Sequence, residues 1–261
     1  MSLRLPIPRL VVVLALAGLA ATPAAAESEL LLDPPEALGT IDASTYDVDK
    51  KRVGNAHLVM EQLDDGNLRL ISESGFTAGA RTVITTLFSP VDGGAKLRPL
   101  RQESRSFDHD GNPLGRLLID HAAGYGRCFA PDGEQSAEIP IPDEDRVANT
   151  ALSLLFLPLV QKQTDEIAFQ IFLCGLGTRF VPFIANRAPT NGTPLNVVEV
   201  RYGPDFGFAT LVASSFVPRL SFWFDPESPH RWMAHRLPLY GKGPEVFIVR
   251  NGVPPRWLAD E

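Results

Sequence analysis

Short β-type segments recur along most of this chain, and one long apolar stretch interrupts them. In 81–88 (RTVITTLF), polar and apolar side chains alternate, which is typical of a strand with one face in water and the other in a core. The turn residues Asp65, Gly66 and Asn67 separate two such segments. The interruption, 146–160 (RVANTALSLLFLPLV), is apolar on nearly every side, as a fully buried helix is.

These two features predict the fold class. On the order of a dozen antiparallel strands in one flat sheet would leave a wide apolar face in water. We therefore expect a mostly β protein, built as a large curled antiparallel sheet or half-open β-barrel, with one buried apolar helix as its filling. Asp143 is the expected N-cap of that helix, and Pro158 is expected to end or kink it. The expected strands are 46–50, 56–62, 67–76, 81–88, 96–107, 115–121, 126–129, 166–174, 178–185, 195–202, 209–216, 220–224, 232–237 and 245–250, with the first hairpin turning at 52–54.

The first 26 residues have the pattern of a secretory signal peptide. Arg4 and Arg9 are basic, the run 10–21 is wholly apolar, and Ala24 to Ala26 offer a cleavage site for a signal peptidase. The apolar run makes about 18 Å of helix, too short for a bilayer core of roughly 30 Å. We expect a signal peptide at 1–26, with an uncleaved anchor as the alternative. The rest divides into an exposed extended lead-in at 27–44, a single β-rich domain at 45–252 and a tail at 253–261. The expected location is the periplasm, without a stable membrane span.

The net charge bears on the partners of the chain, and the cysteines bear on its covalent structure. The formal net charge is −7, so we expect no nucleic-acid partner. Cys128 and Cys174 are the two cysteines of the chain. An exported protein meets an oxidising compartment, where these two residues either form a disulfide or remain as two buried thiols.

The common catalytic signatures are missing from the sequence. It has no Gly-x-Ser-x-Gly elbow, no His-Glu-x-x-His, no phosphate-binding loop and no dinucleotide fingerprint. We expect no catalytic residue, no cofactor and no metal site, although enzymatic activity is left open. Asp108, His109 and Asp110 offer metal-ligand types, but Gly111 and Asn112 follow them and favour an exposed turn. Asp120 and His121 are interpreted as a surface pair.

A surplus of aromatic and apolar residues late in the chain predicts a ligand-binding concavity. Arginines in the same part of the chain are candidates for contact with a polar head group. The alternative is an ordinary core with solvated arginines. The expected lining is Leu152, Leu155, Phe156, Leu159, Phe169, Ile171, Phe222, Trp223 and Trp232, and the expected head-group contacts are Arg179, Arg219 and Arg236.

Several short motifs resemble an uncharacterised family of exported bacterial proteins, a domain of unknown function. They are 46–54 (YDVDKKRVG), 65–70 (DGNLRL), 97–101 (LRPLR), 220–224 (LSFWF), 237–240 (LPLY) and 243–246 (GPEV). The resemblance covers most of the chain after the signal peptide. It implies a half-open β-barrel with a helix in its mouth, similar to the periplasmic lipoprotein carriers LolA and LolB, which shelter acyl chains in the concavity.

The leading hypothesis is a periplasmic protein that binds an apolar or amphipathic envelope molecule, such as a lipid or acyl chain, without chemistry. The helix would then shift, or share the cavity, when the ligand enters. One alternative is an interaction module for envelope assembly that binds an envelope protein through its sheet edges. A hydrolase is the third hypothesis, and it requires a pocket of converging polar groups.

Overall fold

The computed structural model describes residues 30–35, 38–77, 79–142, 146–175, 177–188, 197–205, 220–239 and 243–253. They form one antiparallel sheet and three short helical segments, η1 (Asp92–Gly94), α1 (Leu152–Leu155) and α2 (Leu157–Val160). The strands are β1 (Gly39–Tyr46), β2 (Arg52–Gln62), β3 (Leu68–Phe76), β4 (Arg81–Val91), β5 (Lys96–Phe107), β6 (Pro113–Asp120), β7 (Tyr125–Phe129), β8 (Gln135–Pro140), β9 (Glu166–Leu173), β10 (Arg179–Arg187), β11 (Val198–Pro204), β12 (Leu220–Phe224), β13 (Trp232–Pro238) and β14 (Glu245–Arg250).

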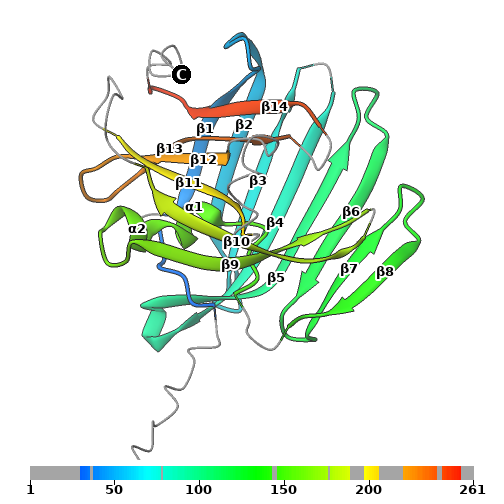
Figure 1. Cartoon of the computed structure of the whole chain (residues 1–261), viewed down its shortest axis with the longest axis horizontal. Coiled ribbons are helices and arrows are strands. Elements are labelled where there is room, and N and C mark those ends of the chain that lie inside the picture. Colours follow the sequence, from blue (N-terminus) through cyan, green and yellow to red (C-terminus); the bar gives the residue numbers. More distant parts are fainter. Residues whose placement is uncertain are drawn as a thin grey trace, which may run out of the picture.

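The strands form a single 14-stranded sheet in the order β8-β7-β6-β5-β4-β3-β2-β1-β14-β13-β12-β11-β10-β9. Neighbours in this order are also neighbours along the chain, except that β1 pairs with β14. The first eight strands and the last six are thus two meanders joined at their first and last strands. The sheet is curled and β8 does not pair with β9, so the prediction of an open, curled antiparallel sheet is confirmed (Figure 1).

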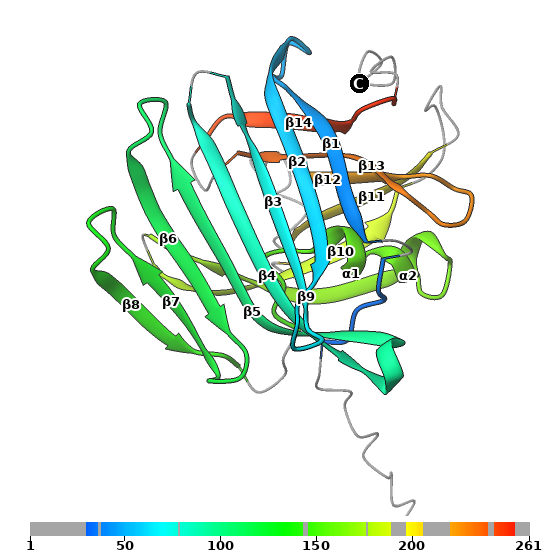
Figure 2. The same ribbon diagram turned by 180° about the vertical axis from the view of Figure 1, so that it is seen from behind.

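The sheet also overlaps itself. Along β9, Phe169 belongs to the central apolar cluster, whereas Phe172 belongs to another cluster with Ile119 of β6 and Cys128 of β7. Residues 169 and 172 lie on opposite faces of the strand because side chains alternate along it. One face of β9 therefore lies toward the centre of the curl, and the other packs under β6 and β7. Figure 1 shows β9 and β10 running across the long strands, and Figure 2 shows β2 to β8 forming the outer surface on the opposite side.

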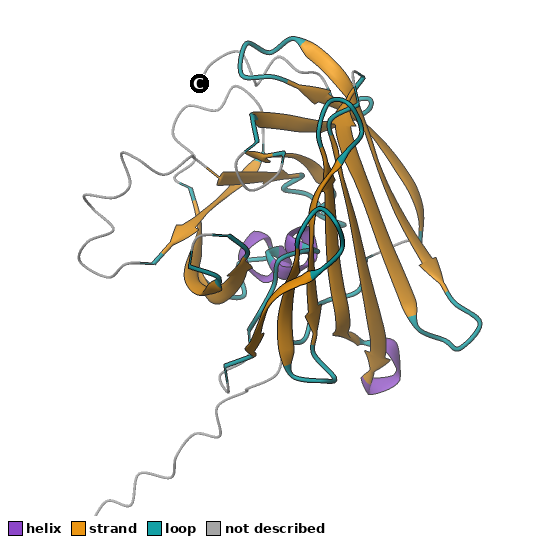
Figure 3. Ribbon diagram, turned by 90° about the vertical axis from the view of Figure 1, so that its right-hand side faces the viewer, coloured by secondary structure: helices purple, strands orange, loops and turns teal. Residues whose placement is uncertain are grey.

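The apolar stretch 146–160 lies inside the curl, as predicted, but it is not one helix. The helices α1 and α2 each span four residues and meet at Phe156 (Figure 3). Pro158 lies in the first turn of α2, where proline needs no hydrogen-bonded N–H group. Residues 146–148 instead run beside β9, with Val147 opposite Gln170. The helix expected from Arg146 therefore begins only at Leu152, because the free edge of β9 satisfies the backbone of the earlier residues.

Four local expectations differ from the structure. Residues 47–50 form a turn after β1, which ends at Tyr46, in place of the expected strand 46–50, so the first hairpin turns there and β2 already begins at Arg52. The strand β8 was not expected at all. The lead-in is not wholly exposed, because Leu30 and Leu32 are buried and Leu32 forms a bridge to Leu97 of β5. The sheet itself begins within that lead-in, at Gly39.

Some expectations concern residues outside the described part of the chain. They are the signal peptide at 1–26, the N-cap Asp143, the strand 209–216, Arg219 and nearly all of the tail.

Candidate functional site

The interior of the curl holds a segment that we call the plug, residues 151–162. Phe156, between α1 and α2, is 0% exposed. Its ring centroid lies 5.9 Å from that of Phe169, 5.4 Å from that of Tyr202 and 5.4 Å from that of Phe222. These distances are typical of favourable aromatic pairs. The side chain at the centre of the plug is thus held by three rings from β9, β11 and β12.

Most of the expected lining residues meet in this interior. Six of them are buried in the same apolar cluster, and two more pack against it partly buried. The six are Leu152, Leu155, Phe156, Leu159, Phe169 and Phe222, and the two are Ile171 and Trp232. The cluster also contains residues that the sequence did not single out, among them Leu154, Val160, Phe183 and Tyr202. Contact of any of these residues with a ligand stays a prediction.

Trp223 lies elsewhere. It belongs to a cluster with Phe247 and Val249, on the opposite, convex face of the sheet, and its ring stacks on that of Phe247. Phe222 and Trp223 are consecutive strand residues, and consecutive side chains point to opposite faces. The expectation that both line the concavity was therefore wrong for Trp223.

The two described arginines of the expected head-group set do not converge. Arg236 lies on the convex face, where its Nε donates to Glu245 Oε1 over 2.5 Å and its guanidinium covers the Phe247 ring. Arg179 is exposed at the start of β10. The structure thus brings most of the apolar lining together but does not join these two arginines to it.

A buried glutamine anchors the segment that leads into the plug. Gln102 of β5 is 1% exposed. Its Oε1 accepts hydrogen bonds from the backbone N–H groups of Asn149 and Thr150 and from the Thr150 hydroxyl, over 2.9–3.0 Å. Its Nε2 donates to the Val147 carbonyl over 3.0 Å. One side chain therefore satisfies four polar groups of this buried segment, as buried backbone requires.

The side chains of the segment complete the anchor. Asn149 donates from Nδ2 to the Phe172 carbonyl over 2.6 Å and accepts from the Phe172 N–H over 2.7 Å, so it takes the place of a neighbouring strand. The Thr150 hydroxyl lies 2.6 Å from that of Thr86. Residues 146–150 are consequently fixed to both β5 and β9.

His121 belongs to the same network: it is half-buried and contacts Gln102, in place of the expected surface pair with Asp120. Gln102 Nε2 lies 2.7 Å from His121 Nε2. Because the amide nitrogen only donates, the ring nitrogen must accept, and the ring is then the neutral tautomer with its proton on Nδ1. Burial lowers the pKa of His121 to about 4, and the nearby Asp120 opposes that shift. The imidazole therefore serves the fold as an acceptor at neutral pH.

The plug is attached to the sheet differently from the segment before it. Its backbone hydrogen bonds run within the plug or to the residue that follows it, for example Phe156 N–H to Leu152 O and Val160 N–H to Phe156 O. Ala151 and Lys162, its first and last residues, have φ of 55° and 61°. This left-handed region is unfavourable for residues other than glycine. Within the described residues, the plug thus meets the sheet through apolar side chains and is bounded by two strained positions.

The disulfide joins the two layers of the overlap. Cys128 of β7 and Cys174, just after β9, are bonded with a Cα–Cα distance of 5.7 Å, so the predicted pairing is confirmed. Gly126, on β7, makes room beside the bridge. A Cβ atom at position 126 would come within 2.9 Å of the Phe172 ring. The glycine therefore allows β9 to pack closely under β7.

A separate groove of about 430 Å³ lies on the convex face, over the ends of β2 to β4. It is lined in part by Asn55, His57, Glu73 and Arg81 and by the turn between β5 and β6. Glu73 Oε1 forms an ion pair with the Arg81 guanidinium over 3.3 Å, and Glu73 Oε2 lies 3.8 Å from His57 Nε2. The groove is thus open and carries charged side chains, unlike the interior of the curl.

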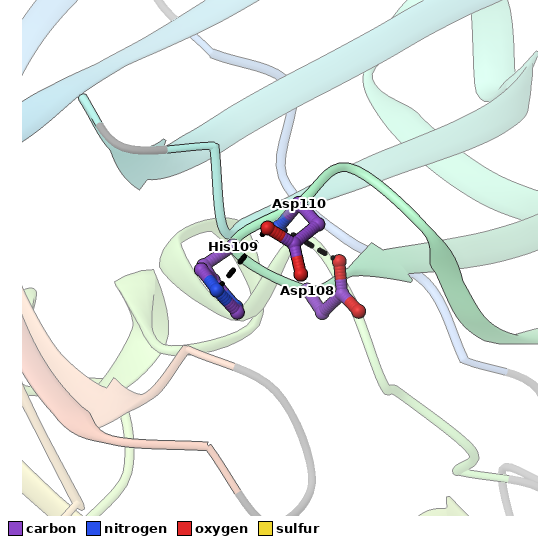
Figure 4. Close-up of side chains that lie close together, drawn as sticks. All are labelled: Asp108, His109 and Asp110. Carbon is purple, nitrogen blue, oxygen red and sulfur yellow. Dashed lines mark hydrogen bonds and ion pairs between the residues drawn. The ribbon is translucent and has the colours of Figure 1, made fainter.

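The turn beside this groove contains Asp108, His109 and Asp110, whose polar atoms lie close together (Figure 4). Asp108 accepts from the N–H groups of Asp110 and Asn112 and from the Asn112 amide, and the Asn112 bonds are the main reason that its pKa is lowered. The predicted turn is confirmed, and both oxygen atoms of the Asp108 carboxylate accept hydrogen bonds from within it.

A scan against protein-family models found no match, and a search of curated proteins found none either. Among solved structures, the chain is similar to a beta-barrel-like protein of a domain of unknown function, DUF1849, from Brucella abortus. The identity is 9%, the match covers 84% of this chain and 100% of that chain, and the TM-score is 0.36.

The described helices include none that is long and apolar enough to cross a membrane.

Proposed function

We propose that this protein is a periplasmic carrier or sensor that binds the acyl chain of an envelope lipid inside the curl, without chemistry, in place of the plug. The Cys128–Cys174 bridge supports an oxidising compartment, in agreement with the expected export signal. The aromatic and aliphatic lining supports an apolar ligand.

The observation that carries the proposal is the attachment of the plug. Residues 146–150 are tied down by Gln102 and β9, whereas the plug has only apolar contacts with the sheet. Moving the plug therefore breaks no described hydrogen bond to the sheet. The left-handed residues Ala151 and Lys162 mark where the backbone would turn.

The free energies of burying the plug and of burying an acyl chain predict which ligands can displace the plug. It buries six apolar side chains, Leu152, Leu154, Leu155, Phe156, Leu159 and Val160. At roughly 1.5–3 kcal/mol each, exposing all six costs on the order of 9–18 kcal/mol. An acyl chain recovers about 0.8 kcal/mol per buried CH₂, so a chain of about 16 carbons supplies roughly 13 kcal/mol and one of about 8 carbons only half of that. Long chains therefore compete with the plug, and short chains do not.

The test is a chain-length series with delipidated protein. Displacement of a fluorescent fatty acid and native mass spectrometry should show one bound ligand for long saturated chains and none for short ones. Binding that is independent of chain length, or absent for every length, would refute displacement of the plug. Trp223→Phe, on the convex face, is the matched control and should bind as the wild type does.

A second function is favoured by the two ends of the sheet. The edge of β9 is covered by 146–148, whereas β8 pairs only with β7 among the described strands and is largely exposed. An uncovered edge can accept a strand from a partner protein. This function predicts slower amide hydrogen exchange at 135–140 in the presence of an envelope extract. Unchanged exchange there would exclude it.

A further inference from the structure

Polar atoms without partners gather on the concave face of the sheet. The buried side-chain atoms without a hydrogen-bond partner in the described part of the chain are Thr45 Oγ1, Arg187 Nε, Trp232 Nε1 and His235 Nδ1. Leaving such an atom unpaired costs about 1–3 kcal/mol, so each one calls for a physical reason. Strand pairing places all four side chains on the concave face, which also carries the clustered apolar residues Phe222 and Ile248.

A β-bulge brings together the two rings that carry Trp232 Nε1 and His235 Nδ1. In β13, Ala234 pairs with Trp223, but Trp232 pairs with Phe224, so the register shifts between them. Residues three apart in a regular strand point to opposite faces, and the extra residue of a bulge restores them to one face. Trp232 and His235 consequently share the concave face, with ring centroids 5.3 Å apart.

This pair borders the volume that the plug occupies. The His235 ring stacks on Phe222, with centroids 4.9 Å apart, and Phe222 in turn contacts Phe156 of the plug. Trp232 packs against the central cluster that contains the plug. A ligand that replaces Phe156 against Phe222 therefore extends toward the two unpaired nitrogen atoms.

From this arrangement we infer that Trp232 and His235 bind the uncharged polar end of an amphipathic ligand, a hydroxyl or ester group such as that of a monoacylglycerol. The inference rests on the function proposed above and names its ligand class. The indole N–H donates to an ester or hydroxyl oxygen, and the imidazole Nδ1 accepts from a hydroxyl group or, in the other tautomer, donates to a carbonyl. Thr45 lies in the same register row, since Thr45 and His235 are both partners of Ile248, and its hydroxyl is placed for a second polar group.

The surroundings disfavour a charged head group at this position. The neighbours of His235 across the sheet are Phe222 and Ile248, both apolar. Burial lowers the pKa of His235 to about 3, so the ring is neutral and offers no positive charge. Of the described cations on this face, Arg187 lies at the far end of the row, beyond Val200, and pairs with Asp165, and Arg179 is exposed at the start of β10. A buried carboxylate or phosphate beside His235 would be uncompensated.

The experiment compares three ligands with the same long acyl chain: a monoacylglycerol, the free fatty acid at alkaline pH and a lysophosphatidic acid. The wild-type protein should bind the monoacylglycerol about 30-fold more tightly than the other two, because a pair of hydrogen bonds at about 1 kcal/mol each is made only with the uncharged end. His235→Phe and Trp232→Phe should each weaken monoacylglycerol binding about five- to tenfold and leave fatty-acid binding unchanged.

Stability separates this role from a structural one. His235→Phe keeps a ring against Phe222 and removes an unpaired nitrogen, so its melting temperature without ligand should equal or exceed that of the wild type. Trp223→Phe, on the opposite face of the neighbouring strand, should bind all three ligands as the wild type does.

Two results would overturn the inference in different ways. Equal binding of the three ligands with no effect of His235→Phe, or a preference for the fatty acid, refutes the polar site and leaves the carrier function standing. Failure to bind any long-chain ligand refutes both.

Discussion

Replacing Phe156 by alanine tests the plug most directly. The side chain is 0% exposed and contacts three aromatic rings, so its removal leaves a cavity in a packed interior. Phenylalanine-to-alanine changes at such sites cost about 3–5 kcal/mol of unfolding free energy. For a domain of this size, a loss of about 4 kcal/mol lowers the melting temperature by roughly 8–16 °C.

The same substitution should strengthen ligand binding. It weakens the plug in the closed state without touching the anchor at Gln102, and an acyl chain fills the vacated volume. Unfolding in urea gives the loss of stability, and displacement of a fluorescent fatty acid gives the affinity. We expect the variant to be less stable than the wild type and to bind long chains more tightly.

Phe247→Ala is the matched control. Phe247 is also buried, but it packs against Trp223 on the convex face, away from the plug. It should lose a similar amount of stability and keep wild-type affinity. If Phe156→Ala lost less than about 1 kcal/mol, the burial of the plug would be wrong. If both variants bound ligand equally, the plug would not compete with it.

Three further outcomes are expected. Cys128→Ala with Cys174→Ala should lower the unfolding free energy by about 4 kcal/mol, since the bridge closes a separation of 46 residues; denaturation with and without reductant measures this, and equal curves would show that the bridge has no such effect. Acidification from pH 6.5 towards 4 should lower the wild-type unfolding free energy, because the folded state holds His121 (pKa about 4) and His235 (pKa about 3) neutral, whereas the unfolded chain takes up the protons first. His121 accounts for up to about 3 kcal/mol of this loss. His121→Gln keeps an acceptor for Gln102 and should remove that share, so an unfolding free energy in urea that falls from pH 7 to 5 as steeply in the variant as in the wild type would contradict this role. Ala151→Gly should relieve the left-handed backbone, raise the melting temperature by about 2–4 °C and weaken uptake of long chains, and a lower melting temperature would count against strain there.

Much of the architecture follows from local pattern. Alternation of polar and apolar residues places most strands because a half-buried strand has a period of two. The pairing of Cys128 with Cys174 follows once a bridge forms, since the chain has no other cysteine. The burial of Phe156 and Leu159 follows from an apolar stretch that has no polar face to turn to water.

The misplaced residues of the site have equally definite causes. Alternation requires Phe222 and Trp223 to face opposite sides, but which of the two faces the concavity depends on the direction of curl. Trp232 and His235 share one face because of a β-bulge, and no turn residue in the sequence indicates that bulge. Gln102 and His121 give no motif, because the backbone groups that they satisfy come from a segment far along the chain.

What the sequence by itself determined is therefore most of the strands, the apolar filling and the two partners of the covalent bridge, all of which depend on neighbouring residues or on simple pairing. Only the tertiary structure decided that 146–150 is extended rather than helical, because its backbone groups find partners on β9 and Gln102. It also decided that β9 packs under β7, where Gly126 and Phe172 meet. Contacts of this kind join residues distant in sequence, and local propensity carries no information about them.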